Sequence, residues 1–373
     1  MKKLDLLYPN NRLNLSEDSI SSLVEKVYIL CTASPREQDR SQCLREQVGI
    51  FTSKYGLVTA EVILGSLISK KDLVKGCHVL AHEIGYAAYK KNPKGFWVGL
   101  KIANSDTCGA GTPHGLVESY LVDHPEVELN NEFIEKVCLN DDPYKQGSCT
   151  HLVGHLFLIE TLGDLEQALP LCKTIDKRFR FNCYDGLFME HHQRFMLSQH
   201  AILPPPKYTK EYIERLEENC LSYTDDVIAR VCWRQMAEVY DHAYGYIPQK
   251  IFDECAKAPK EEFARLCYSK GIIIMSVSPL FNTPEKILSL CSFYKPTSKD
   301  YDSCVNYIIT ANLYNSPKLT KEVTEVCLIT EDNYTKRCFE ILNTKLKVVI
   351  KDKSKRKQYC EMIPAAYSEN CLN

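Results

Sequence analysis

The sequence lacks the features that mark several classes of protein. It has no run of apolar residues long enough for a membrane-spanning helix, so we expect no membrane span. Its formal net charge is only −2, and its single basic cluster, residues 351–357, is short, so a nucleic-acid-binding surface is not expected. It also lacks a Gly-x-Ser-x-Gly elbow, and Gly109-Ala110-Gly111 has neither the third glycine nor the lysine of a phosphate-binding loop.

No Cys-x-x-Cys pair occurs either, although the chain contains 18 cysteines. Zinc knuckles of that kind are therefore not expected. An even number of cysteines at this density is typical of disulfide-bonded proteins, which are secreted, periplasmic or lumenal. We therefore expect an extracytoplasmic protein, although a signal sequence is not visible at the start of this chain.

The spacing of the cysteines predicts the fold. From Cys138 onward, successive pairs each enclose ten to twelve residues and recur about every 33 to 36 residues, with one longer gap. That period is the length of a two-helix repeat. Apolar residues precede each first cysteine at helical spacing, and each second cysteine opens another apolar run, so a disulfide should join one helix to the next. The expected disulfides are Cys31–Cys43, Cys77–Cys108, Cys138–Cys149, Cys172–Cys183, Cys220–Cys232, Cys255–Cys267, Cys291–Cys304, Cys327–Cys338 and Cys360–Cys371.

The sequence thus predicts an all-α fold, an α-solenoid of two-helix repeats in which each hairpin is stapled by a Cys-x10-12-Cys disulfide. A single hairpin cannot bury both of its faces, but a row of hairpins shares a continuous core. The longest interval contains three consecutive prolines, residues 204–206, which cannot continue a helix. We therefore expect a front part, residues 1–200, and a rear part, residues 201–373, that continues the same solenoid.

Two resemblances accompany this pattern. The stapled repeat is similar to the disulfide-bearing Sel1-like repeats of secreted bacterial proteins, which are relatives of tetratricopeptide arrays. The second resemblance is to an uncharacterised group of bacterial extracytoplasmic proteins and implies a shared site within residues 77–192 but no particular reaction. It rests on Cys77-His78 to His82-Glu83-Ile84-Gly85, Cys108-Gly109 to His114-Gly115, Cys149-Thr150-His151 to Gly154-His155, and Gly186-Leu187-Phe188-Met189-Glu190.

All ten histidines lie between residues 78 and 242. Two pairs of them are four residues apart, a spacing that places both imidazoles on one face of a helix, where they can share a metal ion. Equivalent helices of a solenoid stack side by side, so we expect the two pairs to face each other. A histidine from a glycine-rich loop and a glutamate amid apolar residues complete the candidate set. The predicted ligands are His78, His82, His114, His151, His155 and Glu190.

A site rich in imidazole and without thiolate suits a transition metal such as Cu, Fe, Zn or Ni, and argues against Ca and Mg. Such a metal can activate water or bind oxygen, with Glu83 or Glu118 as a nearby general base. Glu83 directly follows His82 and so points to another face of the helix than the histidines do. A zinc protease of the His-Glu-x-x-His type is therefore not expected.

Two functions remain open at this point. The first is a metal-dependent enzyme with one or two metal ions that acts on a small molecule or a peptide. For this enzyme an oxidation–reduction reaction is favoured over hydrolysis. The second is a binding module whose concave face takes a peptide or protein partner. In that case the histidines form a buried hydrogen-bond network that sets the helix register.

Overall fold

The computed structural model describes residues 15–33, 37–68, 77–103, 108–138, 143–199, 201–278, 280–296, 298–315, 320–350, 353–369 and 371–372. These residues form α-helices, short 3-10 helices and turns, and they contain no β-strand. Among these same residues, no helix has the length and apolar character that crossing a bilayer requires.

The chain divides into two compact units. Residues 1–125 and 275–373 form the first unit, and residues 126–274 form the second. The joint that the prolines predict near residue 200 falls inside the second unit, between α12 (Phe195–Gln199) and α13 (Lys210–Ser222).

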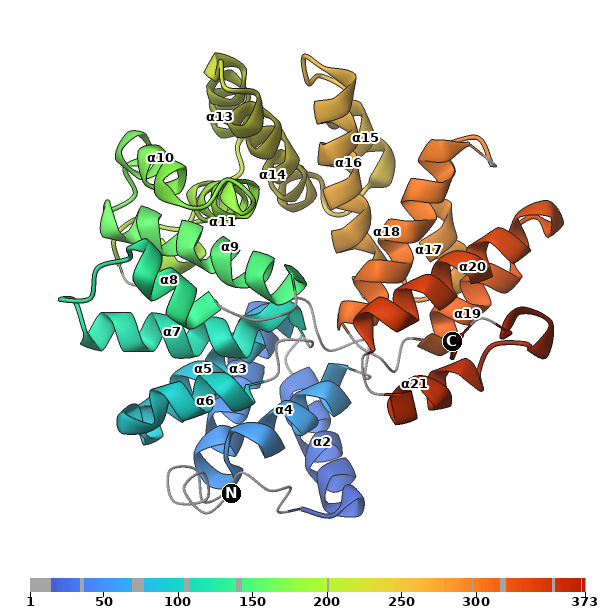
Figure 1. Cartoon of the computed structure of the whole chain (residues 1–373), viewed down its shortest axis with the longest axis horizontal. Coiled ribbons are helices and arrows are strands. Elements are labelled where there is room, and N and C mark those ends of the chain that lie inside the picture. Colours follow the sequence, from blue (N-terminus) through green and yellow to red (C-terminus); the bar gives the residue numbers. More distant parts are fainter. Residues whose placement is uncertain are drawn as a thin grey trace. The chain divides into compact units, whose positions relative to one another are not determined.

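The first unit has helices from both ends of the chain (Figure 1). Within it α5 packs against α3, α4 and α7. Its helices are α2 (Glu17–Thr32), α3 (Glu37–Tyr55), α4 (Leu57–Ile68), α5 (Cys77–Lys91), α6 (Phe96–Ile102), α7 (Gly111–Asp123), α17 (Pro284–Ser289), α18 (Lys299–Asn315), α19 (Thr320–Leu328), α20 (Asp332–Val349) and α21 (Lys353–Cys360), with the 3-10 helices η1 (Pro93–Gly95), η2 (Cys108–Ala110) and η4 (Ala365–Tyr367).

In the second unit, helices pack mainly on their neighbours in the chain. α9 contacts α8, α10 and α11, and α14 contacts α11, α13 and α15. Capping side chains set several helix starts, because Asp164, Thr209 and Asp225 accept hydrogen bonds from backbone N–H groups of the first turn. Besides α12 and α13, the helices are α8 (Asn131–Cys138), α9 (Pro143–Glu160), α10 (Leu165–Thr174), α11 (Arg180–Gln193), α14 (Asp226–Tyr244), α15 (Pro248–Cys255) and α16 (Glu261–Ser276).

Eight disulfides connect consecutive segments, with Cα–Cα distances of 5.3 to 5.7 Å and sequence separations of 11 to 13. The prediction of an all-α fold made of stapled two-helix repeats is confirmed, and hairpins packed in sequence order are the arrangement of an α-solenoid. The eight pairs are Cys31–Cys43, Cys138–Cys149, Cys172–Cys183, Cys220–Cys232, Cys255–Cys267, Cys291–Cys304, Cys327–Cys338 and Cys360–Cys371.

The prediction of a ninth disulfide, Cys77–Cys108, is wrong. Cys77 and Cys108 are buried thiols that do not form a disulfide. Burial raises the pKa of the Cys108 thiol well above its usual range, and a hydrogen bond with Cys77 raises it further. Cys108 lies in left-handed backbone, with φ of 54°, at the start of η2, and its carbonyl oxygen contacts the His78 ring. This cysteine therefore belongs to the surroundings of a histidine and not to a stapled hairpin.

The state of the cysteines can be counted directly. We expect an alkylating reagent to modify only Cys77 and Cys108 when the chain is denatured without a reductant. In the native chain both thiols are buried, and burial raises the pKa of Cys108, so we expect both to resist the same reagent. Mass spectrometry of the labelled peptides gives the count, and an absence of labelled cysteine in the denatured chain would restore the ninth disulfide.

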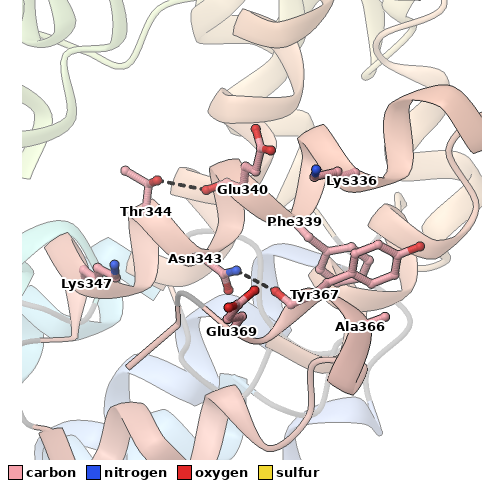
Figure 2. Close-up of a pocket in the computed structure, with 9 residues that line it drawn as sticks. All are labelled: Lys336, Phe339, Glu340, Asn343, Thr344, Lys347, Ala366, Tyr367 and Glu369. Carbon is pink, nitrogen blue, oxygen red and sulfur yellow. Dashed lines mark hydrogen bonds between the residues drawn. The ribbon is translucent and has the colours of Figure 1, made fainter. Parts of the chain in front are cut away.

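A hollow of about 200 Å³ lies in the first unit, between α20 and the C-terminal turn (Figure 2). The rings of Phe339 and Tyr367 stack at 4.5 Å beside it, and Asn343 donates a hydrogen bond to the Tyr367 carbonyl oxygen at 2.8 Å. Its lining contains positively and negatively charged side chains, and none of its residues belongs to the predicted ligand set. The lining residues are Lys336, Phe339, Glu340, Asn343, Thr344, Lys347, Ala366, Tyr367 and Glu369.

Candidate functional site

Helices α5 and α7 of the first unit cross in close contact at two glycines. A Cβ atom on Gly115 would overlap the carbonyl oxygen of His82, and one on Gly85 would overlap the carbonyl oxygen of Thr112. Only glycine permits this approach, because every other residue carries a Cβ atom. The crossing therefore places the first turns of α5 directly beside the first turn of α7.

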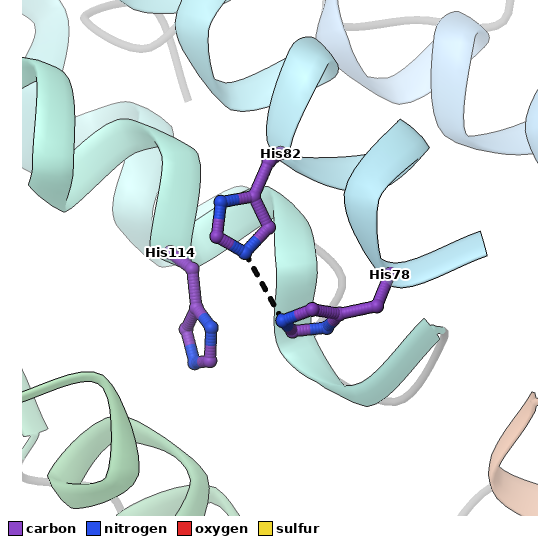
Figure 3. Close-up of side chains that lie close together, drawn as sticks. All are labelled: His78, His82 and His114. Carbon is purple, nitrogen blue, oxygen red and sulfur yellow. Dashed lines mark hydrogen bonds between the residues drawn. The ribbon is translucent and has the colours of Figure 1, made fainter. Parts of the chain in front are cut away.

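Three imidazole rings meet at this crossing (Figure 3). His78 and His82 come from α5, and His114 comes from the first turn of α7 instead of the predicted loop. The Nε2 atoms of His78 and His82 are 3.0 Å apart, and one nitrogen from each of the three rings lies within 4.8 Å of the others. His82 and His114 are buried, with exposed fractions of 3 % and 2 %, while His78 is half-buried.

The other nitrogen of each α5 ring is held by an acceptor. His78 Nδ1 lies 2.7 Å from the carbonyl oxygen of Cys108, which can only accept a hydrogen bond. His82 Nδ1 lies 3.2 Å from the hydroxyl oxygen of Tyr86, whose own proton is donated to Glu118. Both Nδ1 atoms therefore carry the proton, and this leaves a lone pair on each Nε2 atom.

The dashed line in Figure 3 marks the contact between the two Nε2 atoms as a hydrogen bond, which requires a proton on one of them. With the ring protons on the Nδ1 atoms, the two lone pairs at 3.0 Å repel each other unless a metal ion lies between them. Two nitrogens bound to one tetrahedral metal ion are roughly 3.3 Å apart, given metal–nitrogen bonds of about 2.0–2.1 Å. The separation of the His78 and His82 Nε2 atoms is thus within a few tenths of an ångström of that expected for two ligands of one ion. His114 supplies a third imidazole, and a polar partner behind each α5 ligand is the usual surrounding of metal-bound histidine.

The same helix crossing recurs in the second unit, between α9 and α11. A Cβ atom on Gly186 would overlap the carbonyl oxygen of His151, and one on Gly154 would overlap the carbonyl oxygen of Cys183. In each crossing, the glycine of the first helix meets the residue three positions before the glycine of the second helix: Gly85 meets Thr112, and Gly154 meets Cys183. Gly154 and Gly186 are therefore the counterparts of Gly85 and Gly115, and His151 is the counterpart of His82.

A second pair of imidazoles meets at this crossing. The Nε2 atoms of His151 and His155, both on α9, are 3.0 Å apart. Two carboxylates of α11 hold the other nitrogens: His151 Nδ1 lies 3.1 Å from Asp185 Oδ2, and His155 Nδ1 lies 3.0 Å from Glu190 Oε2. Burial lowers the pKa of His151 to about 4, although its hydrogen bond with Asp185 acts in the opposite direction.

Both carboxylates are themselves fixed by donors. Asp185 Oδ1 accepts hydrogen bonds from Arg234 and Gln235 of α14. Burial alone would raise the pKa of Asp185, but the Arg234 guanidinium and the His151 hydrogen bond lower it well below its usual range. Glu190 is completely buried, and its Oε1 accepts the backbone N–H of Leu197 at 2.8 Å.

The predicted ligands therefore form two groups. His78, His82 and His114 meet in the first unit, and His151 and His155 meet in the second with separate partners. The two His-x-x-x-His pairs are not in equivalent positions, because His82, the second member of one pair, corresponds to His151, the first member of the other. The two pairs are therefore offset by one helical turn, whereas the sequence analysis expected them at matching positions.

The predicted carboxylates lie behind the histidines. Glu190 contacts His155 Nδ1, and Glu118 contacts Tyr86 and lies 3.5 Å from His82 Nδ1. Burial raises the pKa of Glu83, an effect that the nearby Arg45 partly offsets. Glu118 and Glu190 thus lie on the Nδ1 side of their histidines, where they orient the rings. Neither carboxylate lies between the Nε2 atoms, where a metal ligand or a general base would be expected.

The sequence reasoning missed Asp185, its partner Arg234, and the role of Tyr86 as a partner of His82. Asp185 directly precedes a crossing glycine, as His114 does in the other crossing, so the shared pattern of a polar residue before glycine was the available signal. The Cys108 carbonyl oxygen is a backbone group and has no sequence signal.

Another histidine of α11 lies beside sulfur atoms. His192 is buried, and its nearest ring nitrogen lies within 4.8 Å of the sulfurs of Cys220 and Cys232. Those two sulfurs form a disulfide. A metal ion binds thiolates and not a disulfide, so this group is part of the stapled hairpin.

Comparison with protein-family models, with curated proteins and with solved structures finds no match to this chain. The geometry of its own residues is therefore what supports a function.

Proposed function

We propose that this protein is an extracytoplasmic metalloprotein in which His78, His82 and His114 bind one transition-metal ion, and that it is a metal-dependent enzyme. The observation that carries the proposal is the pair of Nε2 atoms 3.0 Å apart, each with its lone pair directed inward because the Nδ1 proton is donated elsewhere. A buried network without a metal would direct a donor toward one of these nitrogens.

The donor set fits a catalytic site better than a structural one. Three imidazole ligands leave an open position on a four-coordinate ion, and catalytic zinc sites keep such a position for water or substrate. Imidazole without thiolate suits Zn, Cu or Fe. A bound ion of this kind would supply Lewis-acid or redox chemistry.

The chain's own residues would orient the ligands. Cys108 holds His78 through its carbonyl oxygen, and the Tyr86–Glu118 pair holds His82. Because Glu118 is engaged behind His82, it is poorly placed as a general base for water, which favours a redox reaction over hydrolysis. The eight disulfides favour an oxidising compartment outside the cytoplasm.

Metal analysis of two matched alanine variants tests the proposal. Chain purified without chelator should contain a transition metal. His114→Ala should lower the metal affinity of this site by at least about 10-fold, because the loss of a residue that only holds a ligand already lowers affinity that much. His124→Ala, on the residue that ends the same helix, should leave the metal content unchanged, because the His124 ring packs on Tyr120. Equal metal content in wild type and His114→Ala would contradict the proposal.

A further inference from the structure

We propose a second and separate metal site in the second unit, formed by the Nε2 atoms of His151 and His155. Asp185 and Glu190 are its positioning residues. The site uses none of the residues of the first site, so either can be present without the other.

The assignment follows from which groups can donate. An ionised carboxylate only accepts hydrogen bonds. One oxygen of Glu190 already accepts from the Leu197 backbone, and the other faces His155 Nδ1. His155 Nδ1 must therefore carry the proton, which leaves the lone pair on Nε2.

Asp185 imposes the same state on His151. Its Oδ1 accepts from Arg234 and Gln235, so that oxygen is turned away from the ring, and Oδ2 faces His151 Nδ1. The two Nε2 atoms then present lone pairs to each other across 3.0 Å. Either a proton on one Nε2 atom or a metal ion between the two removes the conflict. With both ring protons held on the Nδ1 atoms, a metal ion is what remains, and the distance is close to the roughly 3.3 Å expected for two nitrogens on one tetrahedral ion.

The surroundings favour a cation. Asp185 and Glu190 contribute two negative charges, and Arg234, which contacts Asp185, contributes one positive charge. The charge of Lys270 also acts on His151 and Asp185, but Lys270 forms an ion pair with Glu238. A carboxylate behind a metal-bound histidine fixes the ring and raises the basicity of the ligand, and here both rings have one. With two imidazole ligands, the ion keeps open positions for water or another small ligand.

The shared helix crossing explains how the two sites differ. The residue before the crossing glycine of the second helix is His114 in the first unit and Asp185 in the second. In the first unit this position supplies a third ligand, whereas in the second it supplies an anchor for His151. The second site therefore has fewer protein ligands, and we expect it to hold its metal less tightly.

Glu190→Gln provides a sharp test because it keeps the size of the side chain. The Leu197 N–H still requires an acceptor, so the amide oxygen takes the place of Oε1 and the amide NH₂ faces His155 Nδ1. The NH₂ group can only donate, which moves the ring proton to Nε2 and blocks the lone pair. Asp185→Asn acts on His151 in the same way, because Arg234 and Gln235 select the amide oxygen.

The experiment uses the full chain with His78→Ala and His114→Ala, which disables the first site, and Co²⁺ as the probe. We expect this chain to bind Co²⁺, and we expect Glu190→Gln or Asp185→Asn in the same background to weaken binding about 10- to 100-fold. Glu214→Gln is the control, because Glu214 is exposed and pairs with Lys210 on the surface of α13. ¹⁵N NMR of the metal-free histidine side chains should show the proton of His155 move from Nδ1 to Nε2 in Glu190→Gln, which checks that Glu190 sets the tautomer, while the loss of Co²⁺ affinity is the result that a purely structural role would not predict.

The outcomes separate the two sites. If the chain without the first site binds no Co²⁺ while wild type loses metal on His114→Ala, the second site is overturned and the proposed function stands. If His151→Ala with His155→Ala removes all metal while the chain without the first site still binds Co²⁺, the proposed function fails and the second site stands. A proton on Nε2 of either ring in wild type, together with an absence of Co²⁺ binding, would identify a hydrogen-bonded pair and overturn the second site.

Discussion

Reduction of the disulfides is expected to unfold the chain at temperatures at which the oxidised chain stays folded. Each of the eight bridges closes a loop with a sequence separation of 11 to 13. On the loop-entropy model, a bridge of this size stabilises the folded state by roughly 3 kcal/mol. The net stability of a domain is only about 5–15 kcal/mol, so the loss of several bridges exceeds it.

Thermal unfolding followed by circular dichroism, with and without a phosphine reductant, checks this expectation. The matched control is the chain with Cys77→Ser and Cys108→Ser, which lacks the two thiols but keeps every disulfide. We expect this variant to respond to the reductant as wild type does. A melting temperature that stays unchanged after complete reduction, verified by alkylation of the cysteines, would mean that helix packing alone holds the repeats.

The disulfide pairing was predictable because it is local. A bridge across a two-helix turn depends only on the short stretch of chain that it encloses, and the helical periodicity on either side predicts where each helix ends. No long-range information was needed for eight of the nine pairs.

The ninth pair failed because its cysteines do not occupy the repeat positions. The counterpart of Cys183 in the α5–α7 crossing is Thr112, since each residue lies three positions before the crossing glycine of its helix. No cysteine stands at that position in the first unit, and Cys77 and Cys108 surround His78 instead. The even number of cysteines in the sequence does not reveal that two of them remain thiols.

The histidine clusters were predictable only in part, for the same reason. The spacing of His78 and His82 within one helix places them on one face, and the structure has them so. His114 joins them through a contact between two helices, and a contact of that kind depends on where the helices cross. The register of a crossing is set by which glycines meet, and a sequence without that register cannot show that one histidine pair is offset by a turn from the other.

Replacement of a crossing glycine is expected to destabilise either unit and to disturb its histidines. In Gly186→Ala the new Cβ atom would overlap the carbonyl oxygen of His151, and in Gly115→Ala it would overlap that of His82. These are backbone atoms of hydrogen-bonded helices, so the helices must move apart. Overpacking of this kind typically costs about 1–3 kcal/mol and occasionally more. We also expect weaker metal binding, because the displaced residues are themselves ligands in the two proposed sites.

Two glycines of the same chain provide the controls. Gly147→Ala affects the same α9–α11 pair, but its Cβ atom would meet only the side-chain amide of Asn182, which can rotate away, so its cost should be smaller. Gly65→Ala lies inside α4 with no atom within 4 Å, so it should stabilise the chain by about 0.5–1 kcal/mol through its higher helix propensity. Denaturant unfolding of the four variants should therefore rank them by what the new Cβ atom meets. If Gly186→Ala and Gly65→Ala had the same stability, the glycines would not set the crossing, and the equivalence between the two histidine sites would lose its basis.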